Sequence, residues 1–151
     1  MKVFLQLFLM VLISSSSAYA ENDQTSNEIT DNISHEFVVC ASYFSIVAQG
    51  LRNSGDKTTA TKYDQASETA IDYAVIAAGQ SRTTEMARKV TLARFEIELK
   101  SMVKEIENDV SNISILSNQY AFRCKGVMEN PEAMMKEWEN KVLDRHDKKG
   151  Q

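Results

Sequence analysis

Residues 81–124 form a long stretch that contains neither glycine nor proline. Apolar side chains recur through it at steps of three and four residues, which places them on one face of a helix. That face comprises Leu92, Phe95, Leu99, Met102, Ile106, Val110, Ile113, Leu116, Tyr120 and Cys124. Because a stripe of this length must be covered by other parts of the chain, the sequence predicts an all-α domain organised around it.

The number of helices depends on whether this stretch is interrupted. Between residues 104 and 119 it becomes rich in Asn, Asp and Ser, whose side chains favour caps and turns. A similar polar break lies at residues 53–56. This break and the one at residues 108–111 are equally far from residue 82 along the chain, one before it and one after it. Full turns at both breaks give an up-down bundle of about four helices, plus a short C-terminal helix. Two kinks would instead give a long hairpin, which exposes too much apolar surface unless it dimerises. We favour the bundle.

Two cysteines, Cys40 and Cys124, lie in the part of the chain that we expect to be exported. An even number of cysteines in an exported protein predicts a disulfide, and two cysteines allow only one pairing. Closing so long a loop would stabilise the fold by about 4 kcal/mol on the chain-entropy model. The bridge would join the first helix to the end of the apolar stripe, at one end of the bundle.

Residues 1–20 have the features of a secretory signal peptide. Lys2 supplies a positive charge, residues 3–13 are apolar apart from Gln6, and residues 18–20 read Ala-Tyr-Ala, a typical cleavage site. The apolar run is shorter than the roughly 20 residues that span a bilayer, so no stable membrane anchor is expected. The pattern predicts export, to the periplasm if the source is bacterial and otherwise by secretion.

The remaining chain divides into three segments by composition. Residues 21–33 are polar and lack a sustained period, which predicts a flexible leader. Residues 34–146 form a single helical domain, with Ser34 as the first N-cap, and residues 147–151 form a frayed tail. Within the domain, the alanine-rich face of residues 58–78 would allow close approach of a neighbour, so we expect that helix to lie centrally. Asn130 and Pro131 mark the start of the last helix.

The sequence offers no recognisable catalytic or cofactor site. Its two histidines, His35 and His146, lack the spacing to carboxylates or cysteines that helical metal sites and haem attachment need. We therefore predict no catalytic residues, no cofactor and no metal. The 21 acidic residues outnumber the 17 basic ones, giving a net charge of −4 that becomes −5 once Lys2 is removed with the signal. This balance disfavours nucleic acid as a partner.

Two places are candidates for contact with a partner protein. The first is a concentration of Met134 and Met135 beside Trp138, because methionine packs adaptably against varied surfaces. The alternative is that these side chains, with Val142, only dock the last helix on the bundle. The second place is the loop that contains Asn53 and Asp56, because loops often carry contacts.

In architecture, the chain resembles two kinds of small exported helical protein with one disulfide. These are the periplasmic immunity proteins that neutralise cell-wall-degrading toxins, and the acid-stress chaperones. No functional residue is transferred from either resemblance. The sequence favours a non-enzymatic binding or inhibitor protein with a protein partner. An acid- or envelope-stress chaperone and a small-ligand carrier with a pocket between helices are the alternatives. The sequence does not indicate the oligomeric state.

Overall fold

The structure is a computed structural model that describes residues 16–149, with side chains over residues 24–148. The part of the chain described is all-α, with five α-helices, one short 3-10 helix and no strand. The elements are α2 (Ser16–Asn53), α3 (Lys57–Ala78), α4 (Thr84–Glu105), η1 (Val110–Asn112), α5 (Ile113–Glu129) and α6 (Pro131–Lys149). The predicted helical bundle is confirmed. The C-terminal helix is not short, however, because the 19 residues of α6 exceed the 17 of α5.

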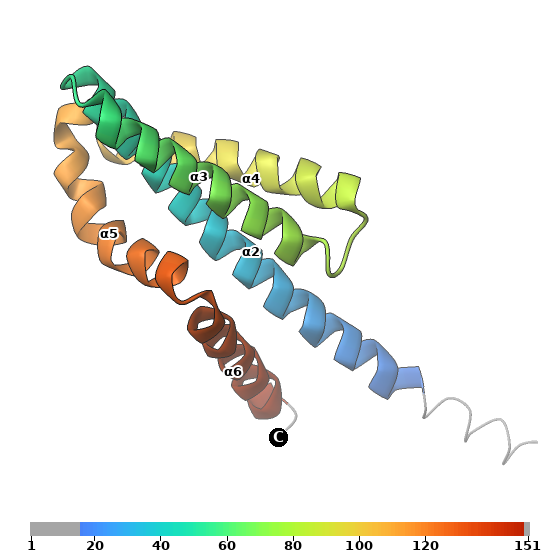
Figure 1. The fold of residues 1–151 in the computed structure, drawn as a ribbon. Helices are drawn as coiled ribbons and strands as arrows, with labels where there is room; N and C mark the ends of the chain where they lie inside the picture. Colours follow the sequence, from blue (N-terminus) through green and yellow to red (C-terminus); the bar gives the residue numbers. More distant parts are fainter. Residues whose placement is uncertain (1–15, 150–151) are drawn as a thin grey trace, which may run out of the picture.

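Helix α2 is the centre of the fold and contacts every other helix. Figure 1 shows α3 and α4 on one side of α2 and α5 and α6 on the other. Val38, Ala41, Ile46 and Ala48 point in different directions around α2, yet all are buried. A helix that is apolar all round lies in the middle of a bundle. The expectation that residues 58–78 lie centrally, with the stripe of residues 81–124 as the organising element, is therefore wrong.

The predicted flexible leader is instead part of α2. Residues 21–33 are helical, Ile33 is buried and Ile29 packs against the core. Ser34 is not an N-cap, since it is buried within the helix and donates a hydrogen bond of 3.0 Å to the Ala74 carbonyl on α3. Contacts with helices far along the chain stabilise a segment whose local sequence does not predict a helix.

The ends of the chain lie partly outside the described residues. Of the predicted signal peptide, residues 1–15 are not described and residues 16–20 belong to the backbone of α2, so export stays a prediction. The predicted frayed tail is wrong for residues 147–149, which continue α6, while residues 150–151 lie outside the description. His146 in this last part of α6 lies 2.9 Å from a Glu28 carboxylate oxygen on α2.

Both predicted breaks are full turns, which distinguishes the bundle from a long hairpin. After α2 the chain turns through Gly55 at φ 92°, a left-handed conformation that glycine adopts without strain. Asp56 then caps α3 by accepting a 3.0 Å hydrogen bond from the Thr59 N–H. After α4 the chain turns through Glu107 and Asn108, both with positive φ. The polar residues that sequence analysis singled out therefore reverse the chain.

The predicted disulfide is present between Cys40 and Cys124, whose Cα atoms are 5.2 Å apart. Both cysteines are fully buried. The bond ties α2 to α5 across a sequence separation of 84 residues. It lies near the middle of the bundle and not at one end, because α2 begins well before Ser34.

No helix within residues 16–149 is long and apolar enough to cross a membrane.

Helix α6 begins as the sequence predicts. Asn130 accepts a 3.2 Å hydrogen bond from the Ala133 N–H, and Pro131 is the first helical residue. The helix docks on the core through the predicted face, with Val142 buried and Met135 and Trp138 partly buried.

Candidate functional site

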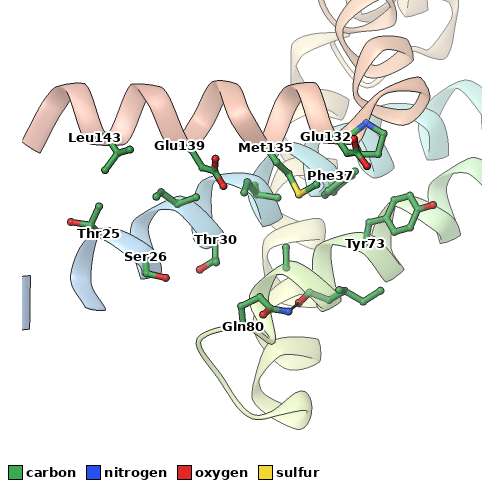
Figure 2. Close-up of a pocket in the computed structure, with 15 residues that line it drawn as sticks. Thr25, Ser26, Thr30, Phe37, Tyr73, Gln80, Glu132, Met135, Glu139 and Leu143 are labelled. Carbon is green, nitrogen blue, oxygen red and sulfur yellow. Dashed lines mark hydrogen bonds between the residues drawn. The ribbon is translucent and has the colours of Figure 1, made fainter. Parts of the chain in front are cut away.

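A groove separates α3 from α6. Both helices pack on α2, yet they scarcely contact each other. The gap is a partly open cavity of about 680 Å³ over the N-terminal half of α2, and Figure 2 shows the side chains that line it. Its lining comprises Thr25, Ser26, Ile29, Thr30, Ile33 and Phe37 from α2, Tyr73, Ile76 and Ala77 from α3, Gln80 from the turn after α3, and Pro131, Glu132, Met135, Glu139 and Leu143 from α6. This volume lies within the range of about 300–1,000 Å³ that is usual for ligand pockets.

The floor of the groove is apolar. Ile29, Ile33 and Phe37 follow one another at four-residue steps, so they form one line along α2. The Phe37 ring packs against Tyr73 of α3, with 5.3 Å between the ring centroids. This aromatic pair closes one end of the floor and joins it to the α3 wall.

The walls expose large apolar side chains to solvent. On α3, Ile76 is 62% exposed and Tyr73 is 40% exposed, and on α6 Leu143 is 49% exposed. Single exposed apolar residues are common on protein surfaces, but these three border one concave apolar surface. Such a continuous patch indicates a binding site.

Among the described residues, the charged side chains in the lining are the carboxylates of Glu132 and Glu139, both on the α6 wall. Both are exposed, and neither belongs to any ion pair found among the described residues. Figure 2 shows the Glu139 side chain directed from α6 toward the groove. No lysine, arginine or histidine of residues 24–148 lines the groove. The groove therefore combines an apolar floor with a negatively charged wall.

Charged contacts to α2 hold both the preceding helix α5 and the later part of α6. Before α6, Arg123 on α5 forms a two-pronged ion pair with Glu36 of α2, one contact of which is 2.8 Å. The hydrogen bonds that the Arg123 guanidinium donates to this carboxylate raise the pKa of Arg123. Near the end of α6, Arg145 and His146 both contact Glu28 of α2. These contacts position α6 beside the groove before any ligand binds.

The α3 wall is held by hydroxyl groups and by a buried face of small side chains. Ala70, Ala74 and Ala78 are fully buried, which lets α3 lie close to α2. At this short separation Ser67 donates a 2.9 Å hydrogen bond to the Ala41 carbonyl, across the two helices. The prediction that the alanines permit close approach is confirmed.

The corner between α3 and α4 is fixed to α2 by a cluster of three charges. Arg82 donates two hydrogen bonds, of 2.7 and 2.9 Å, to the Asp31 carboxylate, and Arg94 lies 3.4 Å from it. The hydrogen bond from Arg82 lowers the pKa of Asp31, and the charge of Arg94 adds to the effect. The groove is thus built on helices that are tied together at several points.

The residues predicted to contact a partner do not form one surface. Met135 lines the groove, but Met134 is buried, and Trp138 is partly buried beneath the Lys141 ammonium, 4.8 Å from the ring centroid. Asn53 and Asp56 are exposed at the turn between α2 and α3.

The turn is remote from the groove. The α2 segment from Phe37 to Asn53 spans about 24 Å at 1.5 Å per residue. The α3 wall was not predicted from the sequence. A signal for it was present, because Ile71, Val75 and Ile76 lie beside the alanine face and one helix face cannot bury all of these side chains.

The described residues of the lining offer apolar surface, hydroxyl and amide groups and two carboxylates. Among the side chains that the structure describes, no three acidic, histidine or cysteine residues are grouped as a metal site. A second cavity, of about 340 Å³, lies beside the almost fully exposed Phe122 on α5 and includes Met134 and Glu137.

Comparisons of the chain with protein-family models, with curated proteins and with solved structures found no match.

Proposed function

We propose that the protein is an exported, non-enzymatic binding or inhibitor protein that holds a basic partner protein in the groove between α3 and α6. The observation that carries this proposal is the concave apolar surface, whose charged groups among the described residues are all carboxylates. Apolar area supplies affinity, while unpaired negative charge selects and orients a positively charged partner. The overall net charge of −4 acts in the same direction.

A pair of matched variants tests this proposal. Ile76 and Ile97 are 62% and 64% exposed on neighbouring helices, but only Ile76 lines the groove. The Ile76→Lys and Ile97→Lys variants therefore introduce the same charge at equally exposed helical sites. Immobilised wild-type protein and the Ile97→Lys variant should retain the same partner from an extract of the native envelope fraction, and the Ile76→Lys variant should lose it. Retention of the same proteins by all three, or of none under several conditions, contradicts the proposal.

A small-ligand carrier is the second candidate, favoured by a groove volume in the range of small-molecule pockets. Native mass spectrometry of protein purified from its own envelope fraction tests it. A carrier should show an added mass that disappears in the Ile76→Lys variant and persists in the Ile97→Lys variant. An unligated mass for wild-type protein removes this candidate.

A further inference from the structure

The bundle is incomplete on the side where the groove lies. In its central part α2 is buried on all sides, whereas at the groove its residues Thr25, Ile29 and Thr30 are only partly buried. Between α3 and α6, this face of α2 is therefore only partly covered around Ile29, whereas Ile33 and Phe37 further along it are buried. One more element packed between α3 and α6 would complete the layer around α2.

The spacing of the wall residues suits a helix as that element. On α6, Glu132, Met135, Glu139 and Leu143 line the groove at steps of three and four residues over about 17 Å, or three helical turns. Side chains arranged in this way form a ridge on each wall, with a depression between the two ridges. A guest helix packs by inserting its own ridge of side chains into such a depression.

The backbone of the walls favours a helical guest over an extended peptide. Apart from Gln80, the lining residues belong to α2, α3 and α6, and N–H and C=O groups in the interior of these helices are already paired internally. The helical walls offer an extended peptide few backbone partners, whereas a helix pairs its own N–H and C=O groups internally. A helix is therefore the guest that fits this groove best.

The charge of the lining favours basic residues along the borders of the guest helix's apolar face. Glu132 and Glu139 project from one wall, and no basic side chain of the described residues lines the groove. A guest with an apolar face bordered by lysine or arginine would place its charges beside these carboxylates. A second copy of this chain would present its own acidic wall to the same surface, which disfavours self-association here.

We infer that the groove between α3 and α6 binds a cationic amphipathic helix of about three turns, supplied by the partner protein. This inference rests on the proposed binding function and names the element that is bound. The guest helix places apolar side chains against Ile29, Ile33 and Ile76 and positive side chains against Glu132 and Glu139.

Synthetic peptides test the inference directly. The probe is an acetylated, amidated peptide of leucine and lysine, about 14 residues long, with leucines at i, i+3, i+4 and i+7. The control peptide has the same composition with leucine and lysine in strict alternation, which favours a strand. Binding of each peptide is measured by titration calorimetry in about 0.15 M salt, because salt screens long-range attraction between the basic peptides and the acidic protein surface. The helical probe should bind with one peptide per protein chain and gain helicity in circular dichroism, and the alternating peptide should bind at least tenfold more weakly.

Paired variants locate the binding site. Ile76→Ala should weaken binding of the helical probe about tenfold, because it removes apolar area that the guest buries. Glu139→Lys should weaken it about fivefold through charge reversal. The controls Ile97→Ala and Glu96→Lys change exposed residues of α4 outside the groove and should leave affinity within about twofold. Circular dichroism and thermal melting verify that all four variants fold.

Several results overturn the inference. The inference is wrong if the alternating peptide binds as tightly as the helical probe, or if the groove variants and the control variants change the affinity equally. It is also wrong if the cationic detergent dodecyltrimethylammonium binds in the groove while neither peptide binds. A wild-type dimer that Ile76→Ala dissociates in sedimentation experiments would make a second copy the occupant, which also overturns it. If the helical probe fails while partner capture still depends on Ile76, the inference fails and the proposed function stands. If capture does not depend on Ile76 either, both fail.

Discussion

Removal of the disulfide between Cys40 and Cys124 should reduce stability by an amount that the loop length sets. The bond joins residues separated by 84 positions, so it closes a loop covering most of the described chain. On the chain-entropy model a loop of this length contributes about 4.6 kcal/mol at 25 °C by restricting the unfolded state. Both sulfur atoms are also buried, so the Cys40→Ala, Cys124→Ala double variant loses some packing and leaves a small cavity. We expect a total loss of about 5 kcal/mol.

Urea unfolding followed by circular dichroism measures this loss. The double variant should unfold at a lower urea concentration and with a steeper dependence on urea, because its unfolded chain is less compact and exposes more surface. The single Cys40→Ala variant should be about as unstable as the double variant, since either substitution removes the bond. A loss below about 1.5 kcal/mol with an unchanged slope would refute the argument that the bond restrains a long loop.

Three further predictions concern the contacts that hold the groove walls. Arg123→Ala should destabilise the protein by about 2 kcal/mol in urea unfolding, because it leaves the buried carboxylate of Glu36 without its partner; no change would show that the pair contributes nothing. Because the pKa of Asp31 is lowered in the folded protein, its carboxylate contributes stability that is fully present above about pH 4 and is lost as pH falls through the folded-state pKa. In the Asp31→Asn variant the free energy of unfolding should therefore fall less steeply with decreasing pH. An unchanged dependence on pH in the acid range contradicts this role. Ser34→Ala should cost about 1 kcal/mol in thermal melting, because the hydroxyl links α2 to the Ala74 carbonyl of α3; an unchanged melting temperature would exclude that link.

Local sequence patterns predicted the features that short-range chemistry determines. The turn at Gly55 and the reversal after α4 follow from residues that favour left-handed backbone or compete for backbone groups. The start of α6 at Asn130 and Pro131 follows from cap chemistry. The pairing of the cysteines follows from their number once export is assumed. Each of these predictions depends on a few neighbouring residues.

Features set by contacts between distant residues were not predicted. Residues 21–33 lack helical periodicity but form part of α2, where Asp31 pairs with Arg82 and Ile33 enters the core. The central position of α2 was visible in principle, because the chain around Val38 is apolar in every direction. The groove could not be predicted from the sequence, because the exposure of Ile76 depends on α6 lying beside α3 without covering it.

The most direct test of the groove as the binding site is methyl NMR of isoleucine-labelled protein. The described chain places Ile29, Ile33 and Ile76 in the lining, and Ile97 and Ile115 on exposed surfaces elsewhere. Addition of the helical leucine–lysine peptide should shift the methyl signals of the first three and leave those of Ile97 and Ile115 in place. Shifts confined to Ile97 or Ile115, or spread equally over all five, would contradict the assignment of the groove as the binding site.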